Sequence, residues 1–439
     1  MPANILNLPQ FTIKKVAESD HDYRIEAEVA EHPDCCLTCN SAEIVGFGRR
    51  DELLMDTPMH GKRVGIVVDR RRYRCSGCGK TFYEIIPGKD SKRHATQRLV
   101  AYVERQALNR TFAQISEEIG IDEKTVRNIF HDYVERQEKS VNFETPRYMG
   151  IDEIHIIQKP RCIVTNIEEQ TLVDMLHNRS KPNITRYFHD LKDKHYVEFV
   201  AMDMWRPYKE AVNACLPKAS IVIDKFHVVR MANDALEKAR KSVRAGLTPS
   251  QRRRLMHDRH ILLRRGRDMT MTEKIAFDSW TLNFPAIGEA YALKEAFYEI
   301  WEKAKTRHEA EVFYSRWESC LSAEMTEHFK PLLTAISNWR NEIFAYFEYP
   351  ITNAYTESLN NLIRFINRAG RGYSFEALRA KILFTYGFHK TKTQRPPFQR
   401  NLDSWDMGRG LPCREAEETN YGASLSTLAR HFQEQASDT

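Results

Sequence analysis

The chain of 439 residues carries 66 Lys and Arg against 60 Asp and Glu, which gives a formal net charge of +6. Because 42% of the residues are hydrophobic and 10% aromatic, the composition excludes an intrinsically disordered chain, and 18 Gly with 17 Pro exclude a collagen-like one. At about 100 to 200 residues per domain, the length predicts two to four domains. The small positive total does not by itself indicate a nucleic-acid partner.

Residues 1–20 lack the basic start, the apolar stretch and the small-residue cleavage site of a signal peptide. No run of about 18 apolar residues occurs in the sequence. We therefore expect a soluble, cytoplasmic protein. The nine cysteines are an odd number, and five of them crowd between residues 35 and 78. That distribution is unlike a secreted disulfide framework and favours a metal site.

Two CxxC motifs supply the thiolates for such a site: Cys36 with Cys39, and Cys75 with Cys78. Each short turn directs two sulfurs at one point, as tetrahedral Zn²⁺ requires, and the residues between the motifs alternate like strands. We predict a DNA-binding zinc-ribbon domain over residues 1–88 with one structural Zn²⁺. Cys35 remains an alternative to Cys36, and a redox pair or buried thiols remain alternatives to zinc.

Helical periodicity begins after Ser91 and predicts a helix-turn-helix domain over residues 89–140. Gly120 can adopt the left-handed turn between the last two helices, and Asp122 can cap the second of them. The outward side chains near the start of that helix are those that reach base edges in the major groove. They are Lys124, Thr125, Arg127 and Asn128. A three-helix packing module without DNA contacts remains the alternative.

The pattern after residue 146 changes to three short apolar runs, followed by helix, strand, helix and strand up to Asp224. This order resembles the ribonuclease H-like layout, an α/β fold. Asp152 lies within the first strand and Asp224 ends the fourth or fifth. A carboxylate in a buried strand is costly unless it is paired or holds a cation. Farther on, Glu357 lies on the polar face of an amphipathic helix over 353–368.

Four segments together resemble the DDE transposases of bacterial insertion sequences: GIDEIHI at 150–156, DMWRPY at 203–208, IVIDKFHVV at 221–229, and NAYTESLNNLIRFINRAGRGYSFEALRAKIL at 353–383. The closest resemblance is to the group that has an N-terminal zinc ribbon, a helix-turn-helix and a helical insertion in the catalytic domain. The resemblance implies Asp152, Asp224 and Glu357 as catalytic acids that hold two Mg²⁺ or Mn²⁺ ions. It also implies strand cleavage and strand transfer at one site.

The resemblance divides the catalytic domain in two, 146–239 and 351–395, separated by an all-helical insertion over 240–350; a tail follows at 396–439. We expect supporting roles for His227, Asp203 and Asn361. His227 could orient a phosphate or Asp224, or it could be a solvated histidine at a helix start. Asp203 is the rival for the second acid, since it too follows an apolar run.

Within the insertion, residues 240–268 carry ten Lys or Arg against two Asp, a local charge of +8. Phosphate binding by Arg252, Arg253 and Arg254 is one interpretation, and a solvated helix face is the other. Arg364 and Arg368, which follow Glu357, could extend a phosphate path. The aromatic residues at helical spacing between 280 and 339 are expected to be core.

From the sequence we expect a transposase that binds the terminal inverted repeats of an insertion sequence, acts on double-stranded DNA as a homodimer, and has no membrane partner. We expect it in the bacterial cytoplasm, at the nucleoid when bound to DNA. A non-catalytic regulator derived from the same scaffold and a metal-dependent nuclease without strand joining remain alternatives. The repeat sequence, the target site, the order of cuts, circle formation and the dimer interface are not predicted.

Overall fold

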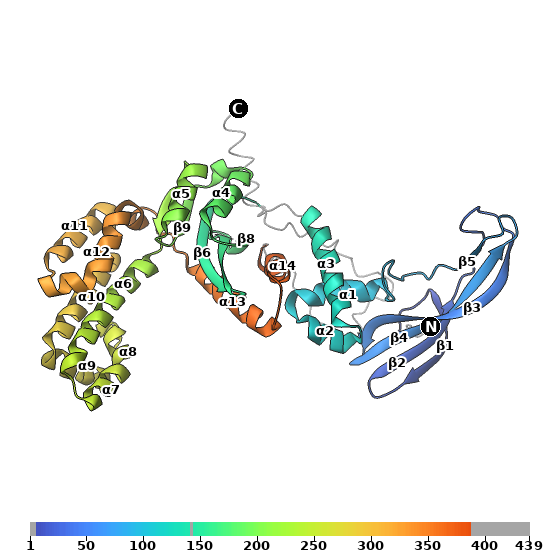
Figure 1. The fold of residues 1–439 in the computed structure, drawn as a ribbon, viewed down its shortest axis with the longest axis horizontal. Helices are drawn as coiled ribbons and strands as arrows, with labels where there is room; N and C mark the ends of the chain where they lie inside the picture. The colour runs from blue at the N-terminus through green and yellow to red at the C-terminus, as the bar shows by residue number, and fades with distance from the viewer. Residues whose placement is uncertain (1–5, 141–143, 388–439) are drawn as a thin grey trace, which may run out of the picture. The chain divides into compact units, whose positions relative to one another are not determined.

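The computed structural model describes residues 6–140 and 144–387, which group into two compact units (Figure 1). The N-terminal unit combines the chain up to residue 141 with 366–385, and the central unit comprises 142–365. The predicted zinc-ribbon and helix-turn-helix domains therefore lie in one compact unit. The predicted tail at 396–439 lies outside the described residues. Within them, no helix combines the length and the apolar character needed to cross a membrane.

A β-sheet forms the first part of the N-terminal unit. Its strands are β1 (Phe11–Glu18), β2 (Asp22–Val29), β3 (Ile44–Met59), β4 (Lys62–Cys75) and β5 (Thr81–Tyr83). They pair in the order β1-β2-β4-β3, with β5 on β4, and β2 runs parallel to β4 while the other pairs are antiparallel. Alternating apolar residues of β2 and β4, among them Ile25, Ile66 and Val68, are fully buried. β1 and β2 are not among the elements predicted from the sequence.

Helices complete this unit. They are α1 (Gln97–Asn109), α2 (Phe112–Ile119), α3 (Glu123–Ser140) and α14 (Phe375–Tyr386). Gly120 ends α2 with φ +71°, and Asp122 accepts a hydrogen bond from the Thr125 N–H at 3.0 Å, so the predicted left-handed turn and the predicted cap are both confirmed. Bonds between Met55 of β3 and the segment before α1 join the sheet to the helices.

The central unit is built on a mixed sheet. Its strands are β6 (Tyr148–Ile156), β7 (Lys159–Asn166), β8 (Thr171–Leu176), β9 (Phe199–Met202) and β10 (Ser220–Ile223). The order is β10-β9-β6-β7-β8; the β10–β9 and β9–β6 pairs are parallel, whereas the β6–β7 and β7–β8 pairs are antiparallel. The associated helices are α4 (Lys181–Asp190), α5 (Arg206–Cys215) and α13 (Ala354–Gly370). This is the predicted ribonuclease H-like arrangement, with a meander followed by βαβ crossovers.

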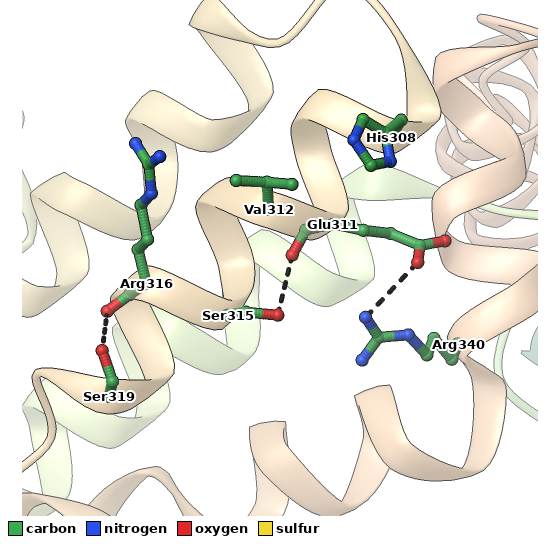
Figure 2. Close-up of a pocket in the computed structure, with 7 residues that line it drawn as sticks. All are labelled: His308, Glu311, Val312, Ser315, Arg316, Ser319 and Arg340. Atoms are coloured by element: carbon green, nitrogen blue, oxygen red, sulfur yellow. Dashed lines mark hydrogen bonds and ion pairs between the residues drawn. The ribbon is translucent and has the colours of Figure 1, made fainter.

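The segment between β10 and α13 is helical, as predicted for the insertion. Its helices are α6 (Lys225–Ser242), α7 (Pro249–His257), α8 (Arg259–Leu263), α9 (Met271–Asn283), α10 (Pro285–Lys303), α11 (Arg307–Ser319) and α12 (Ala323–Phe344). The predicted boundary at residue 240 falls inside α6, which runs unbroken from the end of β10. On the outer side, Arg340 of α12 forms an ion pair with Glu311 of α11 at 3.4 Å (Figure 2).

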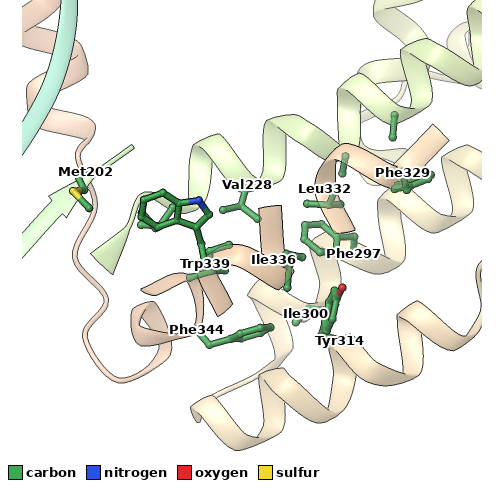
Figure 3. Close-up of a cluster of buried hydrophobic side chains, with 14 of the residues drawn as sticks. Met202, Val228, Phe297, Ile300, Tyr314, Phe329, Leu332, Ile336, Trp339 and Phe344 are labelled. Carbon is green, nitrogen blue, oxygen red and sulfur yellow. The ribbon is translucent and has the colours of Figure 1, made fainter. Parts of the chain in front are cut away.

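The insertion and the sheet share one apolar core. Figure 3 shows its side chains extending from Met202 of β9 to Trp339 and Phe344 of α12. Two tryptophans satisfy their indole N–H groups inside the protein: Trp280 donates to the Asp258 carboxylate at 2.9 Å and Trp317 to the Leu293 carbonyl at 2.8 Å. The prediction that these aromatic residues are core is confirmed for both, because they are 7% and 5% exposed.

Candidate functional site

The four predicted zinc ligands converge at the far end of β4. Their sulfur atoms lie within 4.8 Å of one another, with 3.8 Å between Cys36 and Cys78 and 3.6 Å between Cys39 and Cys75. Sulfurs at about 2.3 Å from a tetrahedral Zn²⁺ are about 3.8 Å apart, so the spacing fits that ion. Cys35 is not a member of this group, which answers the question of which of the two neighbours faces the site.

The helix-turn-helix residues predicted to contact DNA differ in their exposure and in their bonds to other side chains. Lys124 and Asn128 are exposed. The Thr125 hydroxyl donates to Asp122 at 2.6 Å, and Arg127 bonds to Glu123 at 3.0 Å and lies 5.4 Å from the Phe112 ring centroid. Two of the four side chains are therefore engaged within the protein. DNA contact by this set stays a prediction.

Three aspartates stand in a row across the parallel strands of the central unit. Ile151, Met202 and Ile223 are paired in register across β6, β9 and β10, and each is followed by an aspartate. These are Asp152, Asp203 and Asp224. Since β9 lies between β6 and β10, Asp203 is one strand from Asp152 and Asp224 is two strands away, about 4.8 Å against about 9.6 Å.

Helix α13 packs over this row through buried amide side chains. Asn353, the residue before α13, makes two of these bonds. Its backbone N–H donates to Asp224 at 3.0 Å, and its side-chain amide donates to the Ile151 carbonyl at 3.1 Å. Two turns later, the Asn360 side chain donates to Asp152 at 2.7 Å, while its own carbonyl oxygen is buried without a hydrogen-bond partner. An unpartnered buried acceptor beside a carboxylate fits a bound cation or water.

The neighbouring residue predicted to have a supporting role, Asn361, lies elsewhere. It is exposed and accepts a hydrogen bond from Arg364 at 2.9 Å. Asn360 and Asn361 are neighbours on an amphipathic helix, and helical periodicity alone does not distinguish which of the two faces the aspartates. The distinction depends on the rotation of α13 against the sheet, and the buried Leu359 beside Asn360 is the local signal for it.

The remaining candidates gather around Asp203. The His227 Nε2 atom lies 2.7 Å from an Asp203 oxygen and 3.7 Å from a Glu357 oxygen. The side chains of His227, Asp203 and Glu357 are 26%, 28% and 46% exposed, so they are open to a ligand. Asp224 is fully buried, and both of its oxygens accept backbone N–H groups, from Phe226 and Asn353, each at 3.0 Å.

The electrostatics of this cluster favour a cation. Burial, with Asp203 nearby, raises the pKa of Asp152 to about 7. Burial also raises the pKa of Asp224. The hydrogen bond to Asp203 raises the pKa of His227. Burial makes ionisation of these carboxylates unfavourable, and a bound positive ion would stabilise their charged form.

The carboxylates approach one another without forming a closed ligand shell. Among the described residues, the groups of three or more potential metal ligands within 4.8 Å are the four cysteines and a trio on α3: the exposed His131 and Glu135 with the partly buried Asp132. Asp152, Asp203, Asp224 and Glu357 are not among them. The acid set could hold divalent cations through oxygen ligands, which suits Mg²⁺ and Mn²⁺ and differs from the thiolate site.

The predicted basic stretch at 240–268 is largely neutralised. Six of its ten cations have ion pairs: Arg240, Arg254, Arg259, Arg264, Arg265 and Arg267, with partners that include Glu237, Glu273, Glu295 and Glu302. Arg252 and Arg253 are exposed, whereas Arg254 lies 3.7 Å from Asp258. The solvated-face alternative is therefore strengthened for this stretch. Arg364 is partly buried and Arg368 is exposed.

A separate pocket of about 440 Å³ lies on the outer face of α11 and α12 (Figure 2). His308, Val312 and Arg316 line it together with Glu311 and Arg340. Its polar groups are largely engaged with one another, as in the bond from the Ser315 hydroxyl to the Glu311 carbonyl at 3.0 Å. None of the predicted site residues lines it.

Comparison with known proteins shows the family of the chain. A family model described as transposase matches residues 149–382, more than half of the chain. The chain belongs to the ISL3 family of transposases. Two further models match in the N-terminal unit: the helix-turn-helix domain of transposase family ISL3 at 84–134, and the zinc-finger of transposase IS204/IS1001/IS1096/IS1165 at 32–78.

A relative supports the same assignment. The transposase for insertion sequence element IS1001 of Bordetella parapertussis is 20% identical over 325 residues, which cover 72% of this chain and 80% of the relative. The predicted zinc ribbon and helix-turn-helix of this ISL3 transposase are thus confirmed by both geometry and family. The acids, their metal ions and the DNA contacts of individual residues stay predictions.

Proposed function

We propose that the protein binds the terminal inverted repeats of its insertion sequence through the N-terminal unit and cleaves and rejoins DNA strands at the acids of the central unit. Membership of the transposase family and the convergence of Asp152, Asp203, His227 and Glu357 support this proposal. The activity would be cytoplasmic, at the nucleoid, and would use a homodimer because two DNA ends must be brought together.

Asp152 and Glu357 are two of the proposed metal-binding acids, as predicted from the sequence. For the second aspartate, the predicted Asp224 competes with Asp203. The register supports Asp203, because it stands next to Asp152, is partly exposed and faces His227. Asp224 is fully buried, whereas the Asp203 side chain is 28% exposed, and in this proposal the bonds that Asp224 accepts from the Phe226 and Asn353 backbones hold the start of α6 and of α13.

Two divalent ions bound by these acids would lower the pKa of the attacking water or 3′-hydroxyl and stabilise the leaving 3′-oxygen. The residues of the chain contribute orientation. Asn360 donates to one oxygen of Asp152 at 2.7 Å and the Glu153 backbone N–H donates to the other at 2.6 Å, so these bonds orient the carboxylate and a cation would bind through its remaining lone pairs. His227 bridges Asp203 and Glu357, so it can hold a proton or a scissile phosphate between them.

The test uses the zinc-loaded protein, Mg²⁺ and a linear DNA carrying both ends of the element that encodes the chain. Asp152→Asn, Asp203→Asn and Glu357→Gln should each reduce cleavage by at least about 100-fold while end binding and thermal unfolding stay close to wild type. Asp224→Asn should instead lower the unfolding temperature, because an amide cannot accept both backbone bonds as well as a carboxylate does.

Each result separates the alternatives. Full activity of Glu357→Gln would contradict the acid assignment, and inactive but stable Asp224→Asn with active Asp203→Asn would return the second position to Asp224. End binding without cleavage by wild type would favour the non-catalytic regulator. Cleavage without any joined product would favour the nuclease.

A further inference from the structure

The zinc end of the sheet concentrates positive charge. The last pair between β2 and β4 is Ala27 with Val68, so the rest of β4 continues between β3 and β5 alone. The two stretches that form this extension, 44–50 and 70–83, contain seven basic residues and no Asp or Glu. These are Arg49, Arg50, Arg70, Arg71, Arg72, Arg74 and Lys80.

Carboxylates from outside the extension neutralise some of these cations. Arg49 bonds to Asp69 at 2.5 Å, Arg70 to Glu52 at 2.9 Å and Arg71 to Glu84 at 2.8 Å. Among the described residues, no carboxylate forms an ion pair with Arg50, Arg72 or Arg74. Arg50 stands directly opposite Arg70 across the strand pair, an arrangement of like charges that destabilises a sheet. Arg72 donates to the Thr81 hydroxyl at 2.9 Å, a neutral partner, so the positive charges of Arg50, Arg72 and Arg74 remain available to a polyanion.

Aromatic rings hold two of these arginines in place. The Arg72 guanidinium lies 5.3 Å from the Phe47 ring centroid and 5.6 Å from that of Tyr83, and Arg74 lies 5.9 Å from Phe47. Phe47 is itself 48% exposed. A guanidinium stacked on a ring keeps its N–H edge available for a phosphate and loses less freedom when it binds one. We name this surface, Phe47, Arg50, Arg72, Arg74 and Tyr83, the ribbon face.

We propose that the ribbon face binds the phosphate backbone of double-stranded DNA. The inference rests on the proposed function and adds to it a surface outside the helix-turn-helix. Duplex DNA is the favoured polyanion because the same compact unit contains the helix-turn-helix, joined to the sheet through Met55. Contacts to phosphate fix orientation and salt dependence without reading sequence, so this face strengthens binding to any duplex.

The experiment measures fluorescence anisotropy of a labelled 30-base-pair random-sequence duplex with the full-length, zinc-loaded protein at several salt concentrations. Arg72→Ala combined with Arg74→Ala should weaken binding and reduce the slope of log affinity against log salt by about 2, since each phosphate contact contributes about 0.9. Arg72→Lys combined with Arg74→Lys should retain most of the slope. Phe47→Ala should weaken binding about two- to fivefold with the slope unchanged.

The matched control is Lys15→Ala combined with Arg24→Ala. It removes the same charge from β1 and β2 of the same sheet, where both side chains are exposed. The Arg72 and Arg74 double variant and this control could show the same slope of log affinity against log salt with zinc content unchanged. That result would overturn DNA binding by the ribbon face and leave the proposed function intact. Failure of the wild-type protein to bind any duplex would overturn both.

Discussion

A buried lysine connects α14 to the helix-turn-helix and makes the stability of the N-terminal unit depend on pH. Lys381 is 2% exposed. Its ammonium group bonds to the carbonyl oxygens of Ala107 and Arg110, the latter at 2.9 Å, and lies 4.5 Å from the Phe112 ring centroid. Two further rings, those of Phe130 and Tyr373, are within 5.3 Å. Burial nevertheless lowers the pKa of Lys381 from 10.5 to about 7.

The sign follows from proton binding. Between pH 7 and 10.5 the unfolded chain holds a proton on this lysine that the folded chain largely lacks, so stability rises with pH across that window. The difference between the two pKa values corresponds to about 5 kcal/mol of unfolding free energy in total, of which about 2 kcal/mol is gained between pH 7 and pH 9. Replacing the lysine by methionine removes the titrating group and keeps the apolar stem, so Lys381→Met should be more stable than wild type at pH 7.

Hydrogen–deuterium exchange provides the assay, because every described tryptophan lies in the central unit and fluorescence would not report the N-terminal one. The free energy of opening is measured on peptides that cover α1 and α14 at pH 7 and pH 9. From pH 7 to pH 9, the free energy of opening of wild type should rise by about 2 kcal/mol more than that of Lys381→Met. The control Lys139→Met removes an exposed lysine of α3 and should follow wild type. Parallel pH dependence of wild type and Lys381→Met would refute the reasoning.

Two more predictions concern the site and the zinc end. A Cβ atom on Gly150 would lie 2.4 Å from the Thr165 hydroxyl and 2.6 Å from that of Thr356, so Gly150→Ala should separate α13 from the sheet, cost about 1–3 kcal/mol and abolish DNA cleavage. Gly46→Ala, a strand glycine with open space around it, should leave both unfolding and cleavage unchanged, and a fully active Gly150→Ala would contradict the packing. Cys36→Ser combined with Cys39→Ser should release zinc, measured as metal content, and weaken DNA binding while the tryptophan signal of the central unit persists; Cys35→Ser should retain the metal.

The sequence predicts those parts of the protein whose signals are local. Cysteine spacing predicts the thiolate site, and the Gly120 turn with the Asp122 cap predicts the helix-turn-helix; both are confirmed. The first two strands are not predicted because their residues carry no motif, and β2 pairs with β4, a partner that skips β3 in the chain. Sequence order gives no signal for a strand that pairs beyond its neighbour.

The choice between Asp203 and Asp224 illustrates a limit of a different kind. Both residues end short apolar strands, so periodicity treats them alike. What distinguishes them is the strand order, in which β9 separates β10 from β6, and the backbone groups of Asn353 that occupy one oxygen of Asp224. Asn353 is 129 residues from Asp224. The same reason explains the basic stretch, whose acidic partners include Glu302, 37 residues from Arg265.

The compact units do not follow the order of the chain, because residues 366–385 belong to the N-terminal unit. The helix α13 carries Glu357 and Asn360 over the sheet of the central unit, and its last residues, from Ile366, belong to the N-terminal unit together with α14. There Tyr373 packs against Phe112 with ring centroids 5.5 Å apart, and Lys381 caps the end of α1. One continuous helix therefore carries Glu357, a proposed metal-binding acid, and leads directly into the segment that packs on the helix-turn-helix core.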